Sequence, residues 1–73
     1  MTSRSPTLHV LAASRGGWLV VDEDHNATPL SEHLEATAAL RAARAELRAR
    51  GGAGEVLVHD RYHRVQRRVT GAR

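Results

Sequence analysis

The stretch Ala36 to Arg50, ATAALRAARAELRAR, is the longest periodic segment of the chain and decides the fold. Its apolar residues recur every three or four positions, as they do along one face of an α-helix, and its arginines fall mostly off that face. The pattern predicts an amphipathic helix with a narrow apolar stripe. Because most of the stripe is alanine, the helix can approach a sheet closely but buries little apolar area, so we expect a thin core.

The ends of this helix are predicted from the residues on either side of it. Gly51 and Gly52 follow directly and supply the left-handed conformation at which many helices end. Three candidates for the start are Thr28 before Pro29, Ser31, and Glu35 with Leu34 as a hydrophobic staple. We expect a start between Ser31 and Glu35, which places acidic side chains near the positive end of the helix dipole and arginines near its negative end.

Four short runs of β-prone residues flank the helix, two before it and two after it. They are LHVLA at 8–12, WLVV at 18–21, EVLVH at 55–59 and RVQRRV at 64–69. Glycines at 16 and 17 and a turn at 60–63 make each pair a hairpin. The order β-β-α-β-β predicts an α+β fold of two layers, with one helix packed on a mostly antiparallel four-stranded sheet.

This arrangement also predicts how the chain divides. We expect a single domain at 7–69, a flexible N-terminus at 1–6 and a C-terminal tail at 70–73. The charged residues at 22–26 are expected to form a solvated loop between the second strand and the helix. Trp18 is expected to anchor the core beside the alanine-rich helix, and Tyr62 is expected to be exposed in a turn.

Length and composition exclude several classes of protein. A chain of 73 residues is sufficient for one small domain with a marginal core. It contains no cysteine, which excludes disulfides, thiolate catalysis and cysteine-based zinc sites and fits a reducing compartment. It has no apolar run long enough to span a membrane, and its N-terminus lacks the apolar segment of a signal peptide. We therefore expect a cytoplasmic protein with no membrane partner.

The strands carry apolar residues on both of their faces. The runs WLVV and VLV are apolar at both alternating sets of positions, which is typical of strands covered on both sides. One helix covers one face, so the other would be covered by a second copy, a different protein or nucleic acid, unless the sheet simply tolerates some exposed Leu and Val. We expect a homodimer that acts as a protein-interaction module. The interface candidates are Leu11, Leu19, Val21 and Leu57.

The distribution of charge suggests an alternative function. The net charge is +3, the chain has eleven arginines and no lysine, and nine of the arginines follow residue 36. Guanidinium groups gathered in this way bind phosphates without reading base sequence, so the alternative is a nucleic-acid-binding protein. A solvated surface that keeps a small protein soluble is the competing interpretation. The candidate residues are Arg41, Arg44, Arg48, Arg61, Arg64, Arg67 and Arg68.

No catalytic constellation is visible. The serines at 3, 5, 14 and 31 fall in tail, turn or cap positions, and the acidic cluster falls in the expected loop, so neither a nucleophile with its base nor a pair of carboxylates in a pocket is predicted. The domain is also too small to enclose a typical ligand pocket. We therefore expect no catalytic residues, no cofactor and no small-molecule substrate.

The histidines are the candidate metal ligands of the chain. His59 and His63 flank a turn with Asp60 between them, and two imidazoles with a carboxylate would suit zinc or nickel. Histidines in turns are usually solvated, so no metal site is predicted. His9 approaches His59 only if the first and third expected strands pair, and the sequence does not establish that pairing.

Four short motifs stand out along the chain: Leu8-His9-Val10, Gly16-Gly17-Trp18, the helix run from Ala39 to Arg44, and the run from Glu55 to Arg61. Together they resemble the DUF2188 family of small bacterial proteins. The members of that family share an HVxP…GGW opening, an AxxxAR helix and an ELxVHxxDGxI ending.

The resemblance spans roughly 8–68 and implies the same order of four strands and one helix. Two departures stand out. Tyr62-His63 replaces the family's Asp-Gly in the last turn, and the lysine common in the family helix is missing. The type of that turn therefore does not follow from the resemblance. Because the family has no known function, the resemblance implies no site residues.

Overall fold

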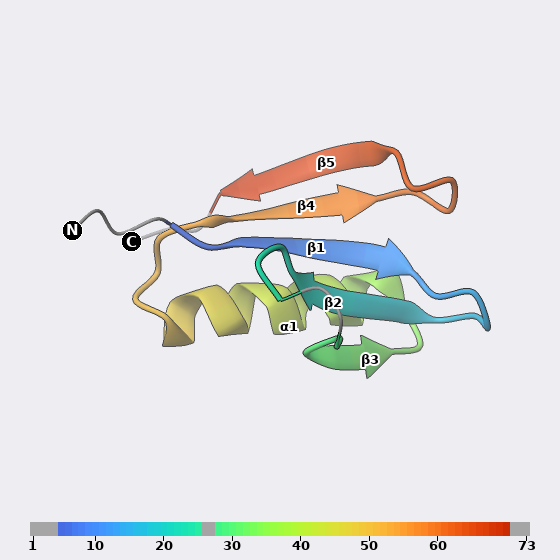
Figure 1. Cartoon of the computed structure of the whole chain (residues 1–73), viewed down its shortest axis with the longest axis horizontal. Helices are drawn as coiled ribbons and strands as arrows, with labels where there is room; N and C mark the ends of the chain where they lie inside the picture. Colours follow the sequence, from blue (N-terminus) through green and yellow to red (C-terminus); the bar gives the residue numbers. More distant parts are fainter. Residues whose placement is uncertain (1–4, 26–27, 71–73) are drawn as a thin grey trace.

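The computed structural model describes residues 5–25 and 28–70 of the chain. Its elements, in order, are β1 (Thr7–Ala12), β2 (Trp18–Asp22), β3 (Ser31–His33), α1 (Ala36–Ala49), β4 (Glu55–His59) and β5 (Val65–Thr70). They form two layers, a sheet with α1 packed on one face (Figure 1). The predicted α+β class with one helix on one sheet is confirmed. Among the described residues, no helix has the length and apolar character needed to cross a membrane.

The sheet differs from the prediction in the number and direction of its strands. Within residues 5–25 and 28–70, five strands lie in the order β3-β2-β1-β4-β5, where four were expected. The pairs β1–β2, β2–β3 and β4–β5 are antiparallel, but β1 and β4 are parallel. Parallel strands cannot be joined by a tight turn, and α1 makes the crossover between them. The sheet is therefore mixed, and the first strand of the chain lies at its centre.

The fifth strand occupies residues that were expected to begin the helix. In β3, Ser31 pairs with Val20 and His33 with Trp18. Three polar residues show no strand periodicity, and cross-strand pairing with β2 overrides their weak β-propensity. The helix therefore begins later, at Ala36, with Glu35 as an extended N-cap that makes no side-chain capping bond. Acidic Glu35 thus lies directly before the helix, as expected, although no acidic residue lies within the first turn itself.

The two ends of α1 differ in how well they were predicted. Leu34 is 92% exposed, so the predicted hydrophobic staple is absent. At the other end, Gly51 and Gly52 have positive φ, and the N–H of Gly52 donates to the carbonyl oxygen of Leu47 at 2.8 Å. Gly54 is also required, because a Cβ there would lie 2.5 Å from the carbonyl oxygen of Pro6. It lets the chain enter β4 close against the start of β1.

The core lies between α1 and the sheet face that it covers. Its members are fully or nearly fully buried: Leu8, Val10, Val20, Val56 and Val58 from the strands, and Ala39, Ala43 and Leu47 from the helix. Partly buried Trp18 packs against this cluster, as expected of a core anchor. Tyr62 is 78% exposed, also as expected.

Asp22 corrects the expectation of a solvated loop at 22–26. It is the last residue of β2, pairs with Leu8 in the sheet and is only 6% exposed. Arg50, just beyond the helix, donates a hydrogen bond from Nη1 to Oδ2 of Asp22 at 2.7 Å. That bond is the main cause that lowers the pKa of Asp22 below its ordinary value. The ion pair of Asp22 with Arg50 therefore joins the end of β2 to the C-terminal end of α1.

Some expectations fall outside the described residues. These are residues 1–4 of the N-terminus expected to be flexible at 1–6, residue 26 of the loop expected at 22–26, and residues 71–73 of the tail expected at 70–73. Thr70, which was expected in the tail, is the last residue of β5.

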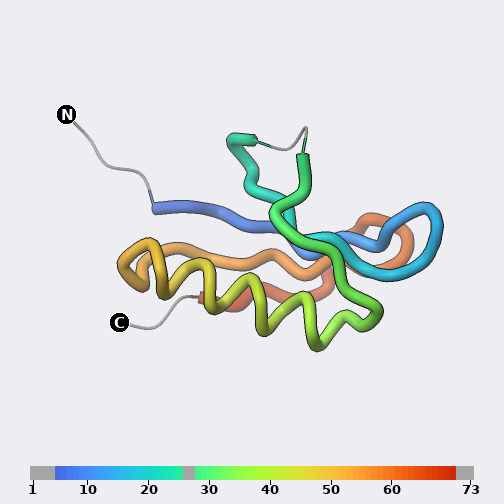
Figure 2. The backbone as a smooth tube through the Cα atoms, turned by 90° about the horizontal axis from the view of Figure 1, so that it is seen from below, coloured from blue at the N-terminus to red at the C-terminus, as the bar shows by residue number. Residues whose placement is uncertain are grey.

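The β1–β2 and β4–β5 turns lie at the same end of the sheet (Figures 1 and 2).

Candidate functional site

The sheet face opposite α1, called the open face below, collects the predicted interface residues. Successive side chains of a strand point to opposite faces, so the neighbours of buried Leu8 and Val10 point away from the helix. By register, His9 lies beside Val21 and Leu57, and Leu11 lies beside Leu19. All four predicted interface residues therefore share the open face. Within the described residues no helix lies over it, and the chain after β2 rises along its β2 side (Figure 2).

The four residues are not equally accessible. Val21 is 5% exposed although it lies outside the core cluster, so it is already shielded within the chain. Leu11, Leu19 and Leu57 are partly exposed. Leu11 and Leu19 are cross-strand neighbours, and Leu57 lies diagonally across from Leu11, beside His9. These three residues, on the three inner strands of the sheet, are called the apolar strip below. This strip is the apolar surface that the open face offers to a partner.

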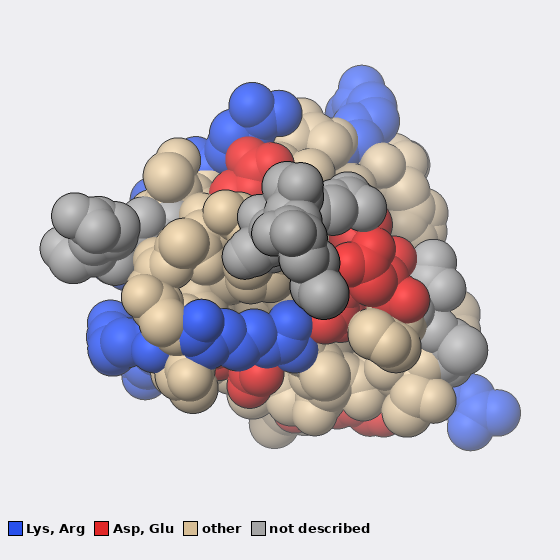
Figure 3. All heavy atoms as spheres, turned by 60° about the vertical axis from the view of Figure 1, so that its left-hand side comes forward, with Lys and Arg blue, Asp and Glu red and all other residues tan. Residues whose placement is uncertain are grey.

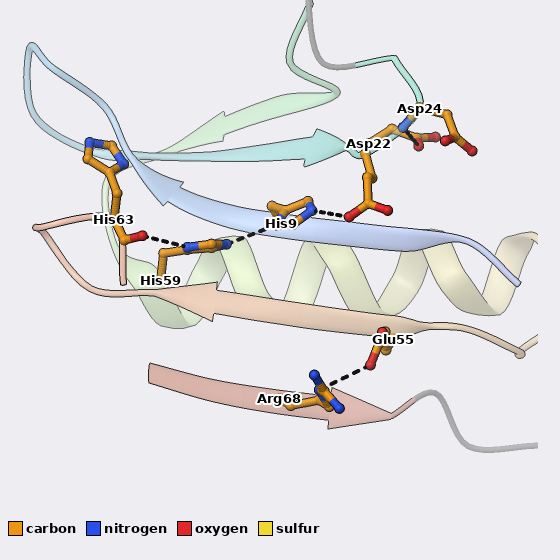
Figure 4. Close-up of polar contacts among 8 residues, drawn as sticks. His9, Asp22, Asp24, Glu55, His59, His63 and Arg68 are labelled. Carbon is orange, nitrogen blue, oxygen red and sulfur yellow. Dashed lines mark hydrogen bonds and ion pairs between the residues drawn. The ribbon is translucent and has the colours of Figure 1, made fainter. Parts of the chain in front are cut away.

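Two histidines lie in the middle of the open face. Nδ1 of His9 lies 2.8 Å from Nε2 of His59, and their ring centroids are 5.1 Å apart. On the far side of the His9 ring, Nε2 lies 2.9 Å from Oε1 of Glu23. Nδ1 of His59 lies 3.3 Å from the backbone carbonyl oxygen of His63. Figure 4 shows these side chains in front of the sheet and α1 behind it.

The histidine pair depends on a contact that the sequence left open. His9 and His59 approach each other because β1 and β4 pair in parallel. The other candidate grouping, His59 and His63 with Asp60, does not form a ligand set, because His63 contributes its backbone carbonyl. Among the described residues, no group of three or more histidine, aspartate or glutamate side chains lies close enough together to hold a metal ion.

Asp60 has a structural role in the β4–β5 turn. Its Oδ1 accepts hydrogen bonds from the backbone N–H groups of Tyr62, at 2.8 Å, and Arg64, at 3.0 Å. The backbone bond from Arg64 is the main cause that lowers the pKa of Asp60. His63 sits inside this turn with φ of 66°, the left-handed region that glycine adopts without strain.

The left-handed residue in this turn stands where the resemblance of the sequence placed a glycine. A family described as "Uncharacterized protein conserved in bacteria (DUF2188)" matches residues 8–70. The chain belongs to the DUF2188 family. The resemblance inferred from the sequence motifs is thereby confirmed, over nearly the whole domain. Comparisons with curated proteins and with solved structures gave no match.

The seven predicted arginines of this DUF2188 protein do not form one surface. Arg64 and Arg68 are paired, with Asp60 at 2.9 Å and Glu55 at 3.3 Å. Arg68 lies on the open face by its register with Leu57. Figure 3 shows arginine atoms directly beside acidic atoms on the face that it presents, as local pairing requires. Arg61 lies apart, in a hollow of about 410 Å³ between the two hairpin turns, with Trp18 and His63.

Four arginines form a separate group, called the arginine flank below: Arg41, Arg44, Arg48 and Arg67. Arg50 and Glu46 reach Asp22 on the β2 side of α1, so the opposite flank of the helix, at 41, 44 and 48, faces the β4–β5 side. Arg67 lies on the same face of the sheet as α1, because it is registered with buried Val58. No acidic partner of these four occurs among the described residues.

One contact resembles part of a catalytic arrangement and was missed from the sequence. Ser31 Oγ and His33 Nε2 lie 2.9 Å apart on β3. In the described residues no carboxylate bonds to His33, so no acidic group orients the imidazole as it would in a triad. The pair therefore bridges two neighbouring side chains on the edge strand. It went unnoticed because β3 itself was not predicted.

Proposed function

We propose that this DUF2188 protein is a small, non-enzymatic interaction module of the cytoplasm that works as a homodimer through its open face. One observation carries the proposal. Leu11, Leu19 and Leu57 form an apolar strip across three neighbouring strands on the face that α1 leaves uncovered. Apolar side chains grouped on an uncovered sheet face are typical of an interaction site. Burying this strip would give a thin, one-helix core the second layer that it lacks.

The distribution of charge on the open face supports a second copy as the partner. Glu32 lies on the β3 edge and Glu23 on the β2 side, whereas Arg68 lies on the β5 edge. If two open faces meet about a two-fold axis parallel to the strands, the β5 edge of each copy lies over the β3 edge of the other. Arg68 then lies near the partner's Glu32 at two places, offset by about two residues along the strands, a span that an extended arginine side chain covers. Arg68 contacts Glu55 of its own chain through Nε, so its terminal guanidinium nitrogens remain to bond Glu32 of the second copy.

Light scattering on the purified protein tests this proposal. The expected mass is that of a dimer, and Leu19→Asp is expected to weaken association by at least about a hundredfold, because it buries an unpaired charge. Leu34→Asp is the matched control, since Leu34 is 92% exposed and lies outside the strip. A wild-type monomer at all accessible concentrations would contradict the proposal.

Exchange of charge tests the geometry. Glu32→Arg and Arg68→Glu should each weaken the dimer about tenfold, by placing like charges together. The double variant should restore association to within about threefold of wild type, since the two effects are coupled. Additive effects in the double variant would exclude the proposed axis while leaving the open face as the interface.

Nucleic-acid binding is the second candidate, and the arginine flank favours it. The four side chains lie on one side of the molecule with no acidic partner among the described residues, and three of them line a hollow of about 330 Å³ along α1 with Leu40. Guanidinium groups without acidic partners can bind the phosphates of a nucleic-acid backbone. Because the arginine flank is separate from the open face, the two functions can be tested independently.

Binding of a short DNA duplex at several salt concentrations tests this second candidate. Arg44→Ala with Arg48→Ala should lower the slope of log affinity against log salt by about 2, roughly one for each guanidinium group that no longer binds a phosphate. Arg64→Ala with Arg68→Ala is the control, because acidic neighbours already neutralise these two arginines. An equal decrease in both double variants would contradict the assignment to the arginine flank.

A further inference from the structure

The contacts around His9 and His59 fix how many protons the two rings carry. An ionised Glu23 and the carbonyl of His63 can only accept hydrogen bonds, so the ring nitrogens that face them, Nε2 of His9 and Nδ1 of His59, must both be protonated. Two neutral imidazoles carry only these two protons. The inner nitrogens, 2.8 Å apart, would then present two lone pairs to each other. A third proton between them turns this repulsion into a hydrogen bond.

The geometry indicates a proton at this position in preference to a metal ion. The two inner nitrogens are 2.8 Å apart and the two ring centroids are 5.1 Å apart. The difference is about twice the distance from the centre of an imidazole ring to one of its nitrogens. The two nitrogens therefore lie nearly on the line between the rings and point straight at each other. A zinc ion on that line would need about 4 Å between the nitrogens, since each zinc–nitrogen bond is roughly 2 Å. The observed separation is that of a hydrogen bond.

The other charged groups around the pair balance one another. On β4 and β5, Glu55 is paired with Arg68. In the turn between these strands, Asp60 is paired with Arg64. On β2 the neighbour is Val21, which has no charge. The charge at the centre of the open face is therefore set by Glu23 and the two imidazoles.

We propose that His9 and His59 hold one proton between them, and that this proton controls whether the open face can be buried against a second copy. The control of burial by this proton rests on the proposed function. With one shared proton, the group formed by Glu23, His9 and His59 is neutral. Loss of the proton leaves a negative charge and two opposed lone pairs, and a second added proton leaves a positive charge and two opposed N–H groups. Burying either charged state costs free energy, so association should peak where one proton is shared.

Nitrogen-15 NMR of the imidazole rings across pH tests the proton site on dilute, monomeric protein. Nε2 of His9 and Nδ1 of His59 are expected to be protonated, while the inner nitrogens share one proton, seen as a scalar coupling between them across the hydrogen bond. Glu23→Gln should make the shared proton easier to remove, because it takes away the carboxylate that balances the charge. Glu32→Gln is the control, with the same change of charge on the same face and no imidazole contact. Inner nitrogens that share no proton at any pH would overturn the proton site.

Light scattering over the same pH range tests the control of association. The association constant should fall on the order of tenfold on either side of the range in which NMR finds one shared proton. In Glu23→Gln the high-pH fall should move to lower pH, and in Glu32→Gln it should stay in place. A dimer whose association does not change with pH would overturn the regulation alone. A protein that is monomeric at every pH would overturn the regulation together with the proposed function, and the NMR result would then decide the proton site separately.

Discussion

The two faces of the sheet are built from alternate residues of the same strands, yet they differ in kind. The face under α1 carries only apolar side chains at its centre, and Leu8 and Val10 of β1 are fully buried there. The open face mixes Leu11 with His9 and Thr7 along the same strand. Both faces carry apolar side chains. The two faces differ because polar side chains lie between the apolar ones on the open face and do not at the centre of the covered face.

The difference is clearest at two adjacent carboxylates at the end of β2. Asp22 lies on the covered face and is held by Arg50, whereas Glu23 bonds to His9 on the open face. A guanidinium keeps its charge at every physiological pH, but an imidazole can lose it. The covered face thus has a permanent ion pair, and the open face has one that depends on protonation. This contrast fits a covered face that stays packed and supports our proposal that the open face associates with a second copy.

Paired substitutions in β1 test the comparison with the largest expected effect. Leu8→Ala should lower the free energy of unfolding by about 3 kcal/mol, because Leu8 is completely buried in the core. Leu11→Ala should cost only about 1 kcal/mol in the monomer, since Leu11 is partly exposed. Chemical denaturation at low protein concentration measures both values. Equal destabilisation would mean that the two faces are equally buried in a single chain.

The ion pair of the covered face gives the next largest effect. Arg50→Ala should cost about 2 kcal/mol at neutral pH, because it leaves the Asp22 carboxylate buried without its partner. The pKa of Asp22 is lowered in the folded protein, so this stabilisation is complete above the ordinary aspartate pKa of about 3.9 and is lost as the pH falls through the folded value.

Denaturation curves recorded between neutral and acidic pH check this dependence. The difference between wild type and Arg50→Ala should shrink as the pH falls below about 4, where Asp22 takes up its proton. Arg48→Ala is the control, because Arg48 lies in the last turn of α1 without an ion pair among the described residues, and its cost should stay within about 0.5 kcal/mol. A difference that is constant with pH would show that Asp22 and Arg50 are not coupled.

A substitution in the β4–β5 turn should have the smallest effect on the free energy of unfolding, and it should stabilise the protein. His63→Gly should raise the free energy of unfolding by about 0.5–1 kcal/mol, because glycine adopts φ of 66° without the strain of a side chain. The backbone carbonyl that accepts from His59 remains in this variant. His63→Ala removes the imidazole but keeps the strain, so it should leave stability nearly unchanged. Destabilisation by His63→Gly would mean that the imidazole itself supports the open face.

Periodicity predicted the parts of the fold in which neighbouring residues decide the structure. The helix, its glycine end and four strands follow from patterns a few residues long. Leu11, Leu19, Val21 and Leu57 were predicted as one interface set because the strands are apolar on both of their faces, although the sequence does not show which side the helix covers. The strand β3 was missed because three polar residues carry no such pattern, and they are ordered by the backbone of β2.

The parts that the sequence did not predict depend on contacts between distant residues. His9 and His59 are fifty positions apart and meet because β1 and β4 are parallel neighbours. Asp22 was assigned to a loop because its partner, Arg50, is twenty-eight positions away. The seven arginines were one candidate set in the sequence, and the structure divides them by strand register and by acidic neighbours. Each of these outcomes requires the topology of the sheet.

The central position of β1 has a consequence for the chain as it is synthesised. A polypeptide leaves the ribosome with its N-terminus first, so β1 and β2 emerge as a hairpin long before β4 exists. Until residues 55–58 are made, one edge of β1 has no strand beside it and α1 has no complete sheet to cover. The chain must therefore be translated through β4 before the domain can close, and a nascent chain that stalls inside α1 would expose the unpaired edge of β1 to other chains.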